Sequence, residues 1–134
     1  MPTTFPLASA GYAALLGLLA VVLTVRVIRH RVKLKIGTGD GGHAQLAQDL
    51  RAHGNFTEQV PIALLLILVV EASGTPATVV HGLGVALVAA RLASAWGLSH
   101  SLATSKGREI GAGLTILVVA AASLLILYRV FSAG

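Results

Sequence analysis

The chain contains no cysteine and has few charged or aromatic residues. The absence of cysteine excludes disulfides, zinc–thiolate centres and a cysteine nucleophile, so any thiol chemistry must use a thiol from a small molecule. Only 11% of the 134 residues are charged, against about 25% in an average soluble domain, and 55% are hydrophobic. This composition predicts an integral membrane protein, and the polar breaks between its apolar runs are too short to hold a second domain.

The net charge of +5 does not indicate a nucleic-acid partner. The basic residues gather at the predicted ends of apolar runs rather than along a groove that also carries aromatic side chains. We therefore expect no nucleic-acid binding. Four histidines lack the spacing of a metal-ligand set, so no metal site is predicted: His30, His43, His81 and His100.

Four apolar runs predict four membrane-spanning helices, and the first, at residues 7–28, is by itself long enough to cross a hydrocarbon core about 30 Å thick. The second run is strongly apolar only over residues 60–70, so its span must reach back to about Leu50 and draw polar residues into the membrane region. The predicted fold class is all-α: an integral membrane four-helix bundle that forms one domain over residues 1–134. The predicted helices cover residues 7–28, 44–72, 77–98 and 110–131.

The distribution of positive charge predicts the orientation of these helices. The link after the first helix is rich in arginine and lysine, the link before the fourth adds Lys106 and Arg108, and the link at residues 73–76 has no basic residue. Basic loops stay on the cytoplasmic side of a membrane. We therefore expect both basic links in the cytoplasm and both termini on the opposite, periplasmic side.

A polar stripe marks the first half of the second helix. Gln48, Arg51, Asn55 and Glu58 are spaced three, four and three residues apart, which places them on one helical face. An ionisable group at membrane depth costs at least about 2.5 kcal/mol on insertion scales, so we expect the stripe to face the bundle interior. Pro61, just after the stripe, can bend the helix and make room beside it.

The third helix supplies a partner for this stripe. Counted from the cytoplasmic helix ends, Glu58 lies about 12 Å and Arg91 about 10 Å into the membrane. This predicts a contact between them, within or between subunits. Such groups can simply hold helices together, but buried charge pairs stabilise poorly compared with apolar packing. A functional pocket is the other interpretation, in which arginines bind the carboxylates and Glu58 the amine of a small ligand.

The segment Leu-Arg-Ala-His-Gly-Asn-Phe-Thr-Glu-Gln-Val-Pro at residues 50–61 resembles the second-helix signature of the MAPEG family, the membrane-associated proteins of eicosanoid and glutathione metabolism. The Gly-Asp-Gly-Gly run at residues 39–42 is similar to the loop of the bacterial branch, as are His81 and the Ala-Arg-Leu run at residues 90–92. The resemblance implies a homotrimer in the bacterial inner membrane. It also implies a glutathione site between neighbouring subunits on the cytoplasmic side, with lipophilic small molecules and membrane lipids as the other partners.

The resemblance also implies residue roles. Arg51 would bind a glutathione carboxylate, Asn55 would orient the peptide, and Glu58 would take the γ-glutamyl amine. Arg29 or Arg31 matches a basic position that reaches the ligand of the adjacent subunit. The complete set of glutathione-binding residues implied is Arg29, Arg31, Gln48, Arg51, Asn55, Glu58 and Arg91.

The chain departs from the family where catalysis is concerned. Ser94 and Leu98 stand where members often have histidine or tyrosine, and the arginine that activates the thiol in leukotriene synthases has no clean match. Arg108, Lys106 and Ser105 are the candidate catalytic residues. The expected function is a glutathione-dependent transferase or peroxidase, with glutathione as cosubstrate, acting on lipophilic electrophiles. The alternative is a catalytically silent protein that binds glutathione or another anion. A small multidrug exporter is the least favoured alternative, because such exporters rely on a carboxylate in the first helix and residues 7–28 contain none.

Overall fold

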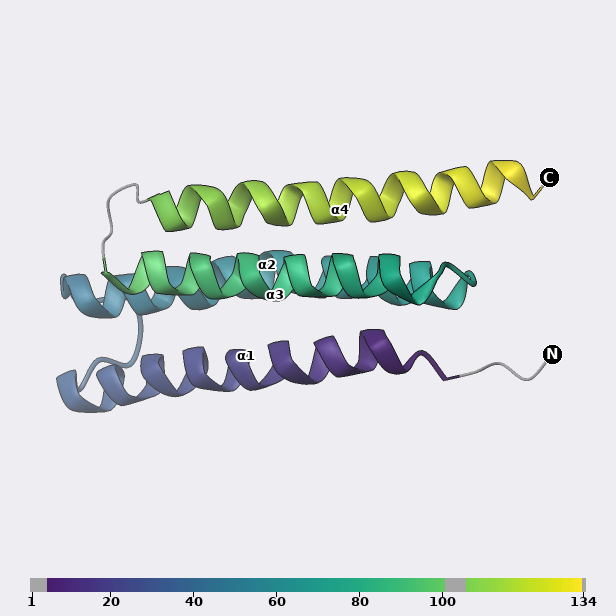
Figure 1. The fold of residues 1–134 in the computed structure, drawn as a ribbon. Helices are drawn as coiled ribbons and strands as arrows, with labels where there is room; N and C mark the ends of the chain where they lie inside the picture. Colours follow the sequence, from purple (N-terminus) through teal and green to yellow (C-terminus); the bar gives the residue numbers. More distant parts are fainter. Residues whose placement is uncertain (1–4, 101–105, 134) are drawn as a thin grey trace.

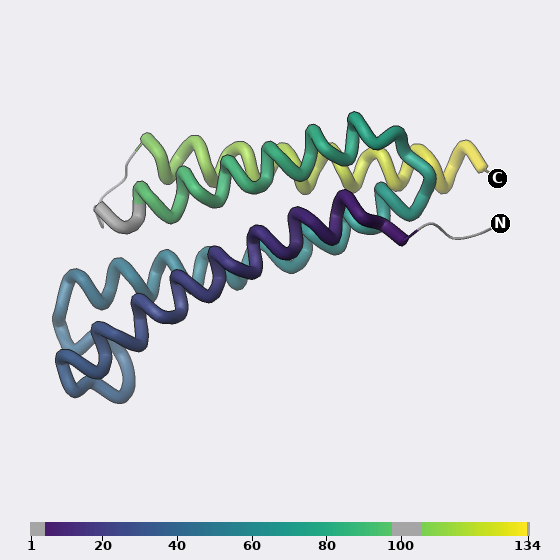
Figure 2. The backbone as a smooth tube through the Cα atoms, turned by 60° about the horizontal axis from the view of Figure 1, so that its bottom comes forward, coloured from purple at the N-terminus to yellow at the C-terminus, as the bar shows by residue number. Residues whose placement is uncertain are grey.

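The computed structural model describes residues 5–100 and 106–133. Four helices follow one another along the chain: α1 (Leu7–Leu34), α2 (Ala44–Ala72), α3 (Ala77–His100) and α4 (Lys106–Ser132). They alternate in direction, so α1 begins and α4 ends at the same end of the bundle (Figure 1). The link between α2 and α3 lies at that end, and the link at residues 35–43 lies at the other (Figure 2). In the described part of the chain α1 and α4 flank α2 and α3 and make no contact with each other.

Three of the helices are longer than the apolar runs that predicted them. α1 continues to Leu34 rather than ending at residue 28, and α4 begins at Lys106 rather than at residue 110. Lys106 and Arg108 therefore lie on a helix and not in a link. The reason is that arginine and lysine are good helix formers, so leaving the membrane core does not end the helix. α1 stops only where Lys35 takes a left-handed conformation with a φ of 55°.

Each of the four helices is long and apolar enough to cross a membrane. Only 17% to 33% of the residues in their most apolar stretches are buried within the chain. Large side chains such as Leu18, Ile116 and Leu124 are 66%, 64% and 67% exposed. Exposed apolar area costs about 25 cal/mol per Å² in water, so lipid or other copies of the chain must cover this surface. The prediction of an all-helical protein with four membrane spans is confirmed.

α3 and α4 pack closely where α4 carries glycine. A Cβ atom added at Gly111 would lie 2.1 Å from the Ser94 hydroxyl oxygen and 2.5 Å from the backbone oxygen of Ala90. Small residues let membrane helices approach one another in this way, so dispersion contacts take the place of a hydrophobic driving force. Gly111 thereby fixes the distance between α4 and the face of α3 that carries Ser94.

Polar contacts fasten the end of the bundle where α1 begins. The Glu71 carboxylate, near the end of α2, accepts hydrogen bonds from the backbone N–H of Ala8 at 3.0 Å and of Ser9 at 2.7 Å. It satisfies donors that the first turn of a helix leaves unpaired, and it places a negative charge at the positive end of the helix dipole. The Tyr12 hydroxyl lies 2.8 Å from Nδ1 of His81, which ties α1 to α3.

Candidate functional site

Arg91 on α3 is the most deeply buried charged group that the structure describes, with 2% of its surface exposed. Its guanidinium donates hydrogen bonds to Oδ1 of Asn55, to Oε1 of Gln59 at 3.1 Å and to the Thr115 hydroxyl at 3.4 Å. It also lies 6.0 Å from the ring centroid of Phe56, within range of a cation–π contact. Arg91 therefore joins α3 to α2 and α4 at one level of the bundle.

All of these partners are neutral. Among the described residues no carboxylate forms an ion pair with Arg91. The Nε atom of Arg91 and the Ser94 hydroxyl are buried and have no hydrogen-bond partner within the part of the chain that is described. Buried charges in proteins are normally paired, because removing a charge from water is costly. The arrangement therefore holds a positive charge that is solvated by amides and a hydroxyl but not neutralised.

The face of α2 that carries the polar stripe was expected to point into the bundle, but it is not the face that packs on the other helices of the chain. Arg51 and Glu58 are exposed, and Gln48 and Asn55 are half-buried. The other helices of the chain pack instead on the apolar face of α2, where Ala52 is buried. The expected inward orientation is thus not found for Arg51 and Glu58 within one chain, whereas Gln48 and Asn55 are half-buried and Asn55 contacts Arg91.

The predicted contact between Glu58 and Arg91 is not formed within the described chain. Glu58 is exposed, whereas Arg91 is buried in the bundle and donates hydrogen bonds to Asn55 and Gln59 of α2. Residues 55 and 59 are one turn apart and lie on the face of α2 that is turned toward Arg91, whereas residue 58 lies on a neighbouring face. The contact within one chain is therefore not found, and a contact between copies stays a prediction.

A groove of about 340 Å³ lies between α2 and α4, beside this cluster. Its lining residues are Glu58, Gln59, Ile62, Thr115, Ile116, Val119 and Ala120. Its polar lining residues are Glu58 and the two acceptors of Arg91, Gln59 and Thr115, and the other four lining residues are apolar. The groove thus connects an apolar surface with the hydrogen-bond shell of the buried cation.

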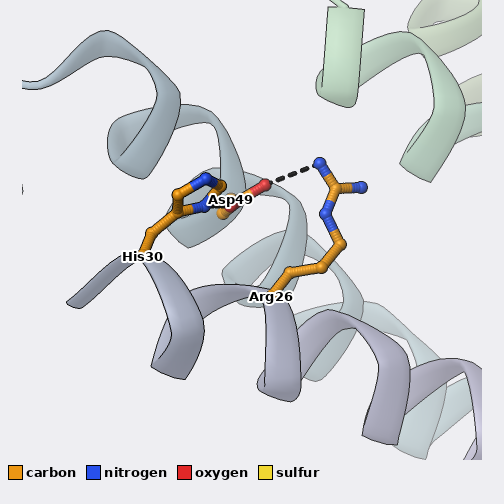
Figure 3. A network of polar contacts seen from close by, with 3 residues as sticks. All are labelled: Arg26, His30 and Asp49. Carbon is orange, nitrogen blue, oxygen red and sulfur yellow. Dashed lines mark hydrogen bonds and ion pairs between the residues drawn. The ribbon is translucent and has the colours of Figure 1, made fainter. Parts of the chain in front are cut away.

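A second polar cluster lies where α1 meets the beginning of α2 (Figure 3). The Asp49 side chain is 2% exposed and forms an ion pair with Arg26 at 2.8 Å. The His30 ring contacts the other Asp49 oxygen through Nδ1. Asp49 was not among the predicted site residues because it lies off the polar stripe. Its position three residues before Ala52, on the apolar face of the helix, is the signal that could have identified it as a buried carboxylate facing basic α1.

The other predicted site residues lie near the same end of the bundle. Arg29 is exposed, and Arg31 is half-buried and donates a hydrogen bond to the backbone oxygen of Gly39 at 3.1 Å. Neither forms an ion pair with the α2 stripe in the part of the chain that is described. On α4, Lys106 is exposed and Arg108 is half-buried. Ser105 lies outside the described residues.

Comparison with known proteins agrees with this architecture. The model of the MAPEG family matches residues 9–128. The chain is 39% identical over 94 residues to the inner membrane protein YecN of Escherichia coli strain K12, a match that covers 70% of this chain and 72% of that protein. YecN of Escherichia coli O6:H1 strain CFT073 matches to the same extent. These matches and the four membrane spans lead to one conclusion: the chain belongs to the MAPEG family and is a membrane protein similar to YecN.

Proposed function

We propose that the protein is a glutathione-dependent transferase or peroxidase of the bacterial inner membrane, with its site formed between copies of a homotrimer on the cytoplasmic side. The observation that carries the proposal is the exposure of Arg51 and Glu58 on α2, a helix that crosses the membrane. Charged groups at membrane depth cost about 2.5 kcal/mol or more when they face lipid. A neighbouring copy that covers the stripe, together with a charged ligand that pairs with it, removes this cost.

Glutathione carries the groups that this stripe can bind. Arg51 would hold a carboxylate in a charge-assisted pair, and Glu58 would hold the amine. The oxygen of the Asn55 amide already accepts a hydrogen bond from Arg91, so its NH₂ group is the end left to donate to a ligand carbonyl. Gln48 extends the stripe by one turn, and Arg29 or Arg31 of an adjacent copy supplies a further cation.

The chemistry follows from the positive charge of the site. Arg91 has no anionic partner among the described residues, and a site with excess positive charge favours the thiolate of bound glutathione by lowering its thiol pKa. Arg108, Lys106 and Ser105 are the candidates for direct contact with the sulfur.

The thiolate then attacks an electrophile that arrives from the bilayer along an apolar path such as the α2–α4 groove. A sulfur–carbon bond forms while an electron pair leaves with the leaving group, or moves onto a conjugated carbonyl that takes a proton. With a hydroperoxide, sulfur bonds to oxygen as the O–O bond breaks and an alcohol leaves. A second glutathione then releases the disulfide and water.

The second candidate function is binding without catalysis. It is favoured by Ser94, which replaces a residue that is often histidine or tyrosine in the family. Ser94 is 1% exposed and lies against Gly111, so its hydroxyl is directed at α4 and not at a ligand. A protein of this kind would bind glutathione or a related anion through Arg51 and Glu58 and leave its sulfur protonated.

The test is the ultraviolet difference spectrum of thiolate formation, recorded on the detergent-purified protein with glutathione. We expect a thiolate signal that Arg51→Ala abolishes. The control is Arg129→Ala, which removes an arginine from the last turn of α4 and should leave the signal intact. Glutathione binding by calorimetry without a thiolate signal would select the silent alternative. Absence of both binding and signal in the folded protein would reject the glutathione site.

A further inference from the structure

We propose that the basic end of α1 is a binding site for the headgroup of an anionic phospholipid. An open groove of about 680 Å³ runs along this end of the helix. Its lining residues are Arg26, Ile28, Arg29, His30, Val32, Lys33 and Gln45. Two of these residues, Arg26 and His30, flank Asp49 in Figure 3. The inference goes beyond the proposed function, because it requires neither glutathione nor catalysis.

The groove lies at the depth of lipid headgroups. The 19 residues from Leu7 to Val25 carry no charge. At about 1.5 Å per residue they span about 28 Å, close to the thickness of the hydrocarbon core. Arg26 therefore stands at the boundary of that core, and Lys33 lies about 10 Å beyond it. The headgroup layer on one side is about 5–7 Å thick, so the basic ladder crosses the level of the phosphates.

The charge of the groove is suited to a phosphate diester. Arg26, Arg29 and Lys33 follow one another at helical spacing and share one face of α1. Asp49 pairs with Arg26, and no described carboxylate pairs with Arg29 or Lys33. Three cations minus one carboxylate leave an excess of two positive charges, without counting His30. Basic pockets beside membrane helices attract acidic lipid headgroups for this reason.

Two features favour a lipid over a small soluble anion. Ile28 lines the same groove, is 53% exposed and lies only two residues beyond Arg26, so it offers apolar contact to the glycerol. The buried Asp49 carboxylate also holds Arg26 and His30 in place, so less side-chain freedom is lost when a headgroup binds. A free phosphate or peptide carboxylate would use the charges but not the apolar rim.

The experiment compares Lys33→Gln with Lys35→Gln. Each variant loses one lysine charge at the end of α1, but only Lys33 lines the groove. The protein is purified in a neutral detergent, phosphatidylglycerol or phosphatidylcholine is added, and the bound lipids are counted by native mass spectrometry. We expect phosphatidylglycerol to be retained in preference to phosphatidylcholine. Lys33→Gln should weaken its binding about fivefold, the effect of one cation near the lipid surface, and Lys35→Gln should not.

Equal retention of the two lipids, or equal loss in the two variants, would overturn the inference, because it would mean a diffuse effect of surface charge. Displacement of phosphatidylglycerol by saturating glutathione would also overturn it, since the groove would then belong to the glutathione site. Lys33 is used in place of Arg29 because the proposed glutathione site includes Arg29. Calorimetry with glutathione on the same variant keeps the two proposals distinguishable: intact glutathione binding without lipid selectivity contradicts this inference alone.

Discussion

Replacement of Asp49 by asparagine tests whether the α1–α2 ion cluster stabilises the fold. The substitution keeps the shape of a side chain that is 2% exposed and removes its charge. Hydrogen bonds to charged groups contribute about 1.5–3 kcal/mol and neutral ones about 0.5–1.5 kcal/mol. With Arg26 and His30 as partners, the loss would be about 2 kcal/mol.

This value must be reduced because the Arg26 side chain is 36% exposed and can find water or headgroups instead. We therefore expect Asp49→Asn to cost about 1–2 kcal/mol. Asp49→Leu should cost more, about 2–3 kcal/mol, because it removes the acceptor that Arg26 and His30 share. For a chain of this size the asparagine variant should lower the Tm by about 3–8 °C.

The assay is thermal unfolding in detergent, followed by circular dichroism. Asp40→Asn is the matched control, since Asp40 accepts a hydrogen bond from the Gly42 N–H at 2.9 Å and asparagine can do the same. Its Tm should stay within about 1 °C of the wild type. The reasoning would be refuted if Asp49→Asn and Asp49→Leu both behaved like the control, or if the leucine variant were the most stable of the three.

Two further predictions concern helix packing and capping. Gly111→Ala should lower the free energy of unfolding by about 2 kcal/mol or more, because its Cβ would lie 2.1 Å from the Ser94 hydroxyl oxygen. The control is Gly113→Ala, whose Cβ meets no atom within 4 Å and which should be neutral or stabilising. Thermal unfolding of both variants in the same detergent checks this, and equal Tm values would count against close packing of α3 on α4. Glu71→Gln should destabilise the first turn of α1 by about 1 kcal/mol, since it removes the charge of the group that accepts a hydrogen bond from the Ser9 backbone N–H. The expected result is faster amide hydrogen exchange confined to residues 8–10. Unchanged exchange there would contradict the role of Glu71 as a helix cap.

The existence of the four helices could be predicted from the sequence, because long apolar runs have few alternatives in a bilayer. Both ends of α2 and the first residues of α1 and α3 were also predicted correctly, whereas the last residue of α1 and the first residue of α4 were not. Outside the membrane core, backbone hydrogen bonding and helix propensity determine where a helix ends, rather than the length of the apolar run. This is why α1 reaches Leu34 and α4 begins at Lys106. The α2 signature also led to the correct family, because a specific pattern of polar residues in an apolar helix is rare by chance.

The direction of the polar stripe was harder to predict. The cost of ionisable groups in lipid says that Arg51 and Glu58 must be covered, but it does not say whether the same chain or another copy covers them. The apolar face of α2 decides this, because α2 packs that face on its own chain and leaves the stripe outside. Asp49 and Glu71 could not be assigned their partners from spacing alone, since both contacts join helices that only tertiary packing brings together.

The measurement that tests the central claim most directly is complementation between two inactive variants. Arg51→Ala and the double variant Arg29→Ala/Arg31→Ala are each expected to lose glutathione binding as pure oligomers. If each site takes Arg51 from one copy and the α1 arginines from its neighbour, random mixing of equal amounts should restore binding at about a quarter of the interfaces of a cyclic oligomer. Recovery of that fraction by calorimetry on the co-expressed, co-purified proteins is the predicted result. Mixed oligomers that bind no glutathione, beside a wild type that does, would contradict a site shared between copies.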